Sequence, residues 1–449
     1  MAESQREQAA RRSVENYPAL GILYDQITGD EDARVCKDIP DAACRHLPRN
    51  YFAYLVANFL GKVADELASA RLVLPWLLGA VGAPAVFIGF LVPVREAGVL
   101  LPQLAVAAYI RRLPKRKGVW LLGALLSAVA LVSMALSAKT LDGVAAGWTV
   151  LAMVTLFSLA RGLCSVSAKD VLGKTVSKTR RGTLMGYSAA LAGVVTLLVG
   201  GYIEFFGGRR PGADFIVTML FIAAALWLLA IAVFALIREE PGATGGGGNA
   251  ISVALHSLAL LKTDRNLRRY VIARALLLST ALAPPFYVLL AQQNSGGVTG
   301  LGMLIIASGL AASLSAPLWG RMGDRSSRRV MVTASLAAGI TGLVTWLLDS
   351  ADFGIMNSPW SYALLFMLVA VFHSGVRLGR KVYLVDMATE DTRSAYVAVS
   401  NTIIGAAMLA GGGVGILADL FRTSAVIALL GAVSILAGLY IARLPDVSG

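Results

Sequence analysis

Long apolar runs separated by short polar segments dominate the chain from about residue 54 onward. A helix needs about 20 residues to cross the roughly 30 Å hydrocarbon core of a bilayer. Six runs of that length carry no formal charge: 118–138, 182–203, 215–237, 330–348, 395–418 and 423–442. Six more are less uniformly apolar: 54–80, 84–110, 143–165, 270–292, 297–320 and 358–380. The pattern predicts an all-α integral membrane protein with twelve transmembrane helices, because the short alternating strands of an outer-membrane barrel are lacking.

An internal repeat divides these spans into two sets of six. A shift of 212 residues, without gaps, places residues of the first half on matching residues of the second: Lys62 on Arg274, Arg116-Lys117 on Arg328-Arg329, Lys169 on Lys381, Arg181 on Arg393, and Gly200-Gly201 on Gly412-Gly413. Two six-helix bundles of the same topology are therefore expected.

The boundaries that follow are a polar tail (1–50), a first bundle (51–237), a linker (238–268), a second bundle (269–443) and a short tail (444–449). The linker combines the glycine run 245–248 with an amphipathic segment near 251–261, which predicts a helix on the membrane surface.

Composition supports a membrane protein and the charge pattern orients it. The residues are 57% hydrophobic and only 15% charged, with a net charge of +13, whereas soluble chains are nearer one quarter charged. With the N-terminus inside, the inner loops hold far more Lys and Arg than the outer loops, so both termini are expected in the cytoplasm. These basic residues form short collars around the spans, which disfavours a nucleic-acid partner. No metal-ligand spacing and no glycine-rich phosphate loop is present, so neither enzymatic activity nor a cofactor is predicted.

Three charged residues fall near the middle of the first two spans. Arg71, Arg95 and Glu96 lie at similar depth on adjacent antiparallel helices. Unpaired, they would cost roughly 8–10 kcal/mol in the membrane centre, so they are expected to face each other or water. The second half has no equivalent cluster, since the repeat places Ala283, Ala307 and Ser308 there. The pair Arg71–Glu96 could simply pin two helices together. Alternatively, an arginine holds an anionic solute, because a guanidinium binds a carboxylate or phosphate through two hydrogen bonds.

Four further ionisable residues are candidates for solute binding or proton coupling. Asp65 and Glu66 lie on the first span, Arg161 on the fourth and His373 on the tenth. A buried carboxylate or a histidine can exchange a proton near neutral pH. Lys62 precedes Glu66 by four residues, which predicts a same-face ion pair.

The loop after the eighth span carries a recognisable motif. The segment GRMGDRSSRR, residues 320–329, resembles the G-x-x-x-D-R-x-G-R-R signature of the major facilitator superfamily, with Ser327 in place of a glycine. The matching residues are Gly320, Asp324, Arg325, Arg328 and Arg329. The resemblance extends over about residues 50–445. It implies a secondary transporter with spans three, six, nine and twelve at the periphery, and a gating role for this loop between the two halves.

The sequence thus predicts a transporter that moves a small anionic organic solute by alternating access, with proton coupling as an option. An exporter of amphipathic drugs or lipids on the same fold is the alternative, and a non-transporting receptor or assembly factor is a third reading. The expected partners are the solute, a proton and the lipid bilayer. The expected setting is a monomer in a bacterial inner membrane.

Overall fold

The computed structural model describes residues 18–28, 41–101, 106, 109–110, 112–206, 213–242, 244, 260–294, 299–323, 325–351, 354–388 and 393–447. Within them, every regular element is a helix. Ten helical segments in this part of the chain are long and apolar enough to cross a membrane. The first and second predicted spans do not meet that criterion; the first is broken into α4 and α5, helix α6 of the second has only 16 residues, and these two spans carry Arg71, Arg95 and Glu96. The predicted all-α membrane fold is confirmed.

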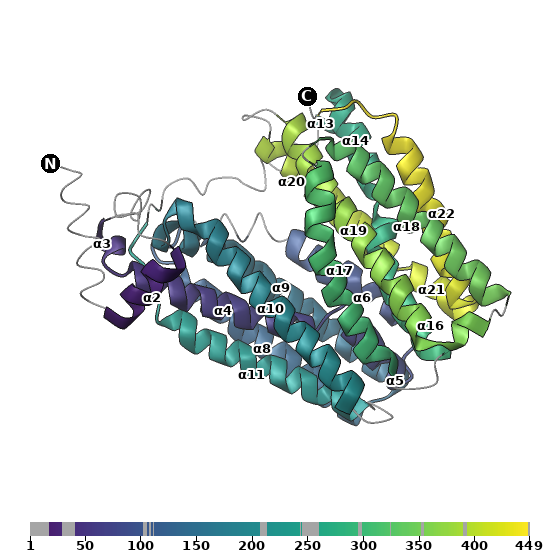
Figure 1. Ribbon diagram of the computed structural model, residues 1–449, viewed down its shortest axis with the longest axis horizontal. Helices are drawn as coiled ribbons and strands as arrows, with labels where there is room; N and C mark the ends of the chain where they lie inside the picture. Colours follow the sequence, from purple (N-terminus) through teal and green to yellow (C-terminus); the bar gives the residue numbers. More distant parts are fainter. Residues whose placement is uncertain are drawn as a thin grey trace.

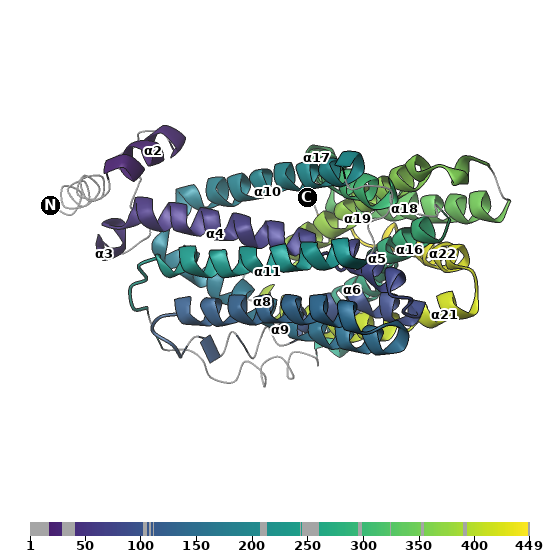
Figure 2. The ribbon, with the colours of Figure 1, turned by 90° about the horizontal axis from the view of Figure 1, so that it is seen from below.

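The first six spans are formed by α4 (Leu47–Leu67) with α5 (Val73–Ala80), α6 (Ala85–Leu100), α8 (Lys117–Thr140), α9 (Gly143–Thr175), α10 (Lys178–Phe206) and α11 (Ala213–Ala235). Helices α10, α4, α11 and α8 run side by side (Figure 2). One face of α8 exposes a row of large apolar side chains: Leu122, Leu125, Val129 and Leu136. Such a contiguous apolar surface suits contact with lipid.

The last six spans repeat this arrangement. They are formed by α14 (Arg265–Leu276), α15 (Leu278–Leu282) and α16 (Pro284–Asn294) together, α17 (Thr299–Gly323), α18 (Ser327–Ser350), α19 (Pro359–Met387), α20 (Arg393–Gly411) with α21 (Val414–Leu420), and α22 (Thr423–Ile441). A short 3₁₀ turn, η2 (Gly354–Asn357), precedes α19. Helices α18 and α22 pack together, as α8 and α11 do in the first half. Spans three and six thus pack together in the first half, as spans nine and twelve do in the second.

Three short helices lie outside the spans: α2 (Pro18–Thr28), α3 (Asp41–Cys44) and α13 (Leu260–Thr263). Helix α2 contacts α4 through Tyr24 and Tyr51, whose ring centroids are 5.2 Å apart in an edge-to-face arrangement. The glycine run 245–248 and residues 251–259 of the predicted surface helix lie outside the described residues, so of that helix only α13 is seen.

The breaks in the first and seventh spans have local causes. Helix α4 ends at Leu67, and the next turn is closed by Ser69, whose carbonyl accepts the backbone N–H groups of Leu72, Val73 and Leu74. Pro75 then lies in the first turn of α5, where a missing N–H costs little. In the seventh span Pro284 begins α16 for the same reason. The first break places Arg71 in an irregular turn at the centre of the bundle.

The two halves meet at the ends of their helices that point away from α3 and α13, and they separate toward α3 and α13 (Figure 1). Helix α10 packs on α17, and α6 packs on α20 and α21. These contacts are close because glycines line them. A Cβ on Gly89 would lie 2.7 Å from the Gly412 carbonyl, and one on Gly302 would lie 2.8 Å from the Glu204 backbone nitrogen. The side that carries α3 and α13, called the termini side below, is therefore the open one.

Candidate functional site

A central cavity of about 360 Å³ lies between the halves. It is lined by residues of spans one, two, seven, eight and ten: Asp65, Glu66, Ala68, Ser69, Ala70, Arg71, Leu72, Val92, Arg95, Glu96, Pro284, Ser308, Ala311, Ala312, Phe366, Ala370, His373, Ser374 and Arg377. Its size falls in the usual range for small-molecule sites, about 300–1,000 Å³. Six of the seven predicted binding or coupling residues line it, and the seventh, Arg161, lies directly behind Asp65.

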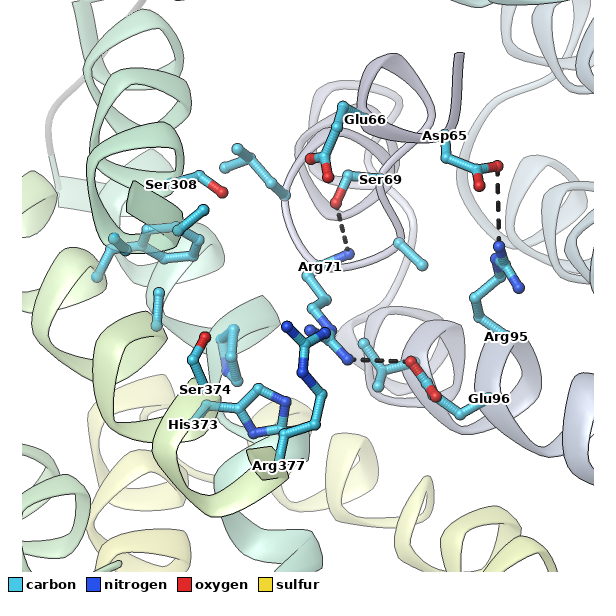
Figure 3. Close-up of a pocket in the computed structure, with 18 of the residues that line it drawn as sticks. Asp65, Glu66, Ser69, Arg71, Arg95, Glu96, Ser308, His373, Ser374 and Arg377 are labelled. Atoms are coloured by element: carbon cyan, nitrogen blue, oxygen red, sulfur yellow. Dashed lines mark hydrogen bonds and ion pairs between the residues drawn. The ribbon is translucent and has the colours of Figure 1, made fainter. Parts of the chain in front are cut away.

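The break after α4 positions the first ion pair. Arg71 donates from Nη2 to Glu96 Oε1 at 3.0 Å, so the turn of span one is tied to α6. Both side chains stay accessible to the cavity, with 30% and 38% of their surface exposed. The ion pair between Arg71 and Glu96, which the sequence predicts as a link between the first two spans, is therefore present. It is also open enough for a solute to compete for Arg71 (Figure 3).

Asp65 is shared by two arginines. Arg161 on α9 donates to Asp65 Oδ2 at 2.7 Å, and Arg95 on α6 lies 3.9 Å from Oδ1. Each arginine also rests on an aromatic ring: Arg95 lies 5.1 Å from the Phe157 centroid and Arg161 lies 4.4 Å from that of Trp227. A cation over an aromatic face is attracted by the ring quadrupole, so these contacts hold both guanidiniums in place.

Two cavity residues have no partner in the described part of the chain. Glu66 and Arg377 make no hydrogen bond and no ion pair within 4 Å there, and both side chains are exposed in the cavity. The predicted Lys62–Glu66 pair is thus wrong. Glu66 occupies the last turn of α4, and its carboxylate is directed into the cavity (Figure 3).

His373 lies against a hydroxyl group of the seventh span. Its Nδ1 is 3.2 Å from the Thr280 hydroxyl, which also lies 2.9 Å from the Leu277 carbonyl. Nε2 is buried and has no hydrogen-bond partner in the described residues. His373 therefore contributes its ring to the cavity lining, with Nε2 covered in this conformation.

Sequence reasoning missed two arginines on α19. Arg377 lines the cavity, and Arg380 is half-buried with an unpartnered Nε among the described residues. A signal was available, since His373, Arg377 and Lys381 follow one another at i, i+4 spacing and so share one helix face. Arg377 and Lys381 also line a neighbouring cavity of about 400 Å³, together with Trp319 and Leu378. The cavity wall on α19 is therefore basic from its centre toward the termini side.

The predicted gating loop contacts its own half in this conformation. Arg328 binds the tail after α22, with Nη2 3.3 Å from Asp446 Oδ2 and Nη1 donating to the Leu444 carbonyl at 2.8 Å. The Arg329 backbone N–H donates to the Ser326 hydroxyl that caps α18. Arg325 is exposed, and a Cβ on Gly320 would meet nothing within 4 Å. Asp324 lies outside the described residues, so its gating role stays a prediction.

No group of three or more His, Cys, Asp or Glu residues in the described ranges is placed to hold a metal ion. The described lining of the cavity offers charged and hydroxyl side chains, which can form ion pairs and hydrogen bonds with a solute.

Comparison with known proteins gives a consistent result. The model of the Major Facilitator Superfamily matches residues 271–448. An uncharacterised MFS-type transporter of Methanocaldococcus jannaschii is 22% identical over 379 residues, covering 80% of this chain and 86% of the relative. The crystal structure of a D-xylose–proton symporter aligns with a TM-score of 0.68 at 15% identity, covering 89% of this chain and 99% of that one. A POT family transporter in complex with a thioalcohol-conjugated peptide aligns with a TM-score of 0.67 at 14% identity, covering 88% and 95%.

Proposed function

Because the chain belongs to the major facilitator superfamily, we propose that it is a secondary transporter whose solute is a small organic molecule with an anionic group. The membrane-spanning transporter fold is the premise, and the identity of the solute is the proposal. Proteins of this architecture move solutes by rocking one half against the other around a fixed central site. Here the central cavity is bordered by helices of both halves.

The observation that carries the proposal is the charge of that cavity. Its carboxylates are Asp65, Glu66 and Glu96, and its guanidiniums are Arg71, Arg95, Arg377 and, behind Asp65, Arg161. Four cations against three anions leave one surplus positive charge. A surplus cation in a low-dielectric site is costly unless a counter-charge arrives, and a bound anion supplies it.

The alternative of an amphipathic drug or lipid exporter would be favoured by a cavity lined mainly with aromatic side chains. Among the described residues that line the cavity, Phe366 is the one Phe, Tyr or Trp. Six of the lining residues are acids or arginines. This composition favours the polar solute.

Proton coupling is proposed for Glu96. Protonation would remove its charge and release Arg71, so that Arg71 could bind the solute and the proton would enter with it. If Glu96 carries the proton, Glu96→Gln abolishes accumulation driven by a pH gradient but preserves exchange of solute across the membrane. Loss of both activities in a folded protein would contradict this role.

We further propose that the termini side faces the cytoplasm of a bacterial inner membrane and that the transporter acts as a monomer. The excess of Lys and Arg in the loops on that side supports this orientation. The open side of the cavity is then the cytoplasmic side, and the conformation is inward-facing.

A binding screen tests the proposed solute class. The purified protein is heated with a panel of organic carboxylates and phosphates, with neutral sugars and nucleosides as the comparison set. Stabilisation by at least one anion is expected, because a ligand that binds only the folded state raises the melting temperature. Stabilisation by neutral solutes alone would overturn the proposal.

A further inference from the structure

Glu66 and Arg377 are the unpaired charges of the central cavity, and they come from different halves. Glu66 lies in the last turn of α4 in the first half, and Arg377 lies nearly three turns before the end of α19 in the second. Neither has a hydrogen bond or ion pair in the described chain. Both are directed into the same cavity (Figure 3).

Each of the other cavity charges has a partner of opposite charge. Arg71 holds Glu96 at 3.0 Å, and Asp65 holds Arg161 at 2.7 Å and Arg95 at 3.9 Å. The surplus positive charge of the cluster therefore sits where two arginines share Asp65, and both of these arginines are also stacked on aromatic rings. What the cavity leaves for a solute is one carboxylate and one guanidinium.

Between these two groups the lining offers hydroxyl groups and one guanidinium that already has a partner. The hydroxyls of Ser69, Ser308 and Ser374 border the cavity. Arg71 reaches into the space between Glu66 and Arg377 (Figure 3), and its guanidinium is paired with Glu96 at 3.0 Å.

We infer that the solute is dipolar, with a carboxylate or phosphate bound by Arg377 and a protonated amine bound by Glu66. A solute with only an anionic group would pair Arg377 and leave Glu66 as a like charge in the same cavity. A solute with only a cationic group would leave Arg377 unpaired in the same way. A dipolar solute pairs both, and electrostatic complementarity of this kind is what provides specificity.

The inference rests on the proposed transport function and narrows its solute class to amino acids and aminoalkyl phosphates. Because each end of the solute is held by a different half, such a molecule would also bridge the halves. A bridging solute is the kind of ligand that can favour one arrangement of the halves over another.

Calorimetric titration of the full-length protein in nanodiscs tests this with matched probes. The dipolar probes are the free L-amino acids, 4-aminobutyrate and phosphoethanolamine. Each is compared with its amine-free acid, such as butyrate or ethyl phosphate, and with its acid-free amine. At least one dipolar probe is expected to bind at least about tenfold more tightly than both of its analogues, a difference typical of one charged contact.

Two variants and two controls locate the contacts. Glu66→Gln should erase the preference for the dipolar probe over its amine-free acid, and Arg377→Gln should abolish binding of both. Asp349→Asn, a remote acid, and Arg268→Gln, an exposed arginine outside both the cavity and the gating loop, should leave all dissociation constants unchanged.

The outcomes separate this inference from the proposed function. Amine-free acids that bind the wild type as tightly as the dipolar probes would overturn the inference and leave the proposed anion transport standing. An unchanged preference in a folded Glu66→Gln protein would overturn it as well. Binding by neutral solutes alone, or by none of the probes, would count against both.

Discussion

Asp419 links the two halves on the side of the protein opposite the termini. Its removal should shift the equilibrium between the present conformation and the one that is open on that side. Its carboxylate, at the end of α21, accepts the backbone N–H of Ala85 at 2.6 Å and of Val86 at 2.8 Å. These are the first two residues of α6, which begins after Pro84 without a side-chain cap of its own. One half of the transporter therefore caps a helix of the other half.

The size of the effect follows from known capping energies. A side-chain N-cap contributes about 0.5–2 kcal/mol, and a negative charge at a helix N-terminus adds about 0.3–1 kcal/mol. The contact exists only while this side is closed. Asp419→Ala should therefore destabilise the present conformation by about 1–2 kcal/mol relative to the one open on the opposite side. That is a factor of about 5–30 in their ratio.

Distances between spin labels on the closed side measure this ratio. Cysteines at Thr140 and Trp360, the ends of α8 and α19, carry one label on each half in a background without native cysteines. In the wild type most molecules should show a short distance between the labels. In Asp419→Ala the ratio of molecules with a longer distance to molecules with the short one should rise by the predicted factor. Asp349→Asn is the matched control, because Asp349 accepts from Asn294 at 2.8 Å within its own half. Identical distance distributions in wild type and Asp419→Ala would refute the capping argument.

Three other substitutions test separate contacts. The double variant Arg71→Glu with Glu96→Arg should fold and reach the membrane but fail to transport, because the ion pair is kept while the field in the cavity is reversed; full uptake in reconstituted vesicles would end the binding role. Gly200→Ala should lower the transport rate, since its Cβ would lie 2.9 Å from a side chain of α17, whereas Gly201→Ala, with nothing within 4 Å, should not; equal uptake by the two variants would contradict this packing. Glu239→Gln should lower the melting temperature, because its buried carboxylate accepts two backbone N–H groups at 2.7–2.9 Å and a lysine at 3.0 Å, and losing a buried partner costs about 3–5 kcal/mol; an unchanged melting curve would show that water replaces it.

The positions of the spans could be read from the sequence because they depend on local composition. Each predicted run lies on one helix or on two or three consecutive helices, and some ends differ by up to ten residues, as in α9, which continues to Thr175 beyond the predicted 165. The α18 range Ser327–Ser350 against the predicted 330–348 is typical. The breaks were harder to place. Pro75 and Pro284 were visible, but the first span bends before Pro75, at the Ser69 turn, because the proline is tolerated at the start of the new helix.

The members of the candidate site were visible as charges within apolar runs. Arg71 and Glu96 stood out because no membrane segment keeps such residues near its centre without a partner or water. Arg377 was missed because it lies close to the end of its span, where arginines commonly reach the interface. The Asp419 cap was also out of reach, since its partners are backbone groups more than 300 residues away in the chain, and sequence periodicity does not encode contacts between halves.

Solute exchange in reconstituted vesicles tests the central claim most directly. Vesicles loaded with an unlabelled anionic solute, chosen from the binding screen, are given the same solute with a radioactive label, and its entry is followed. The account predicts saturable exchange in the wild type and in Arg268→Gln, and loss of exchange in a correctly inserted Arg377→Gln protein. Exchange at the wild-type rate in Arg377→Gln would contradict the claim that the central cavity binds its solute through an anionic group.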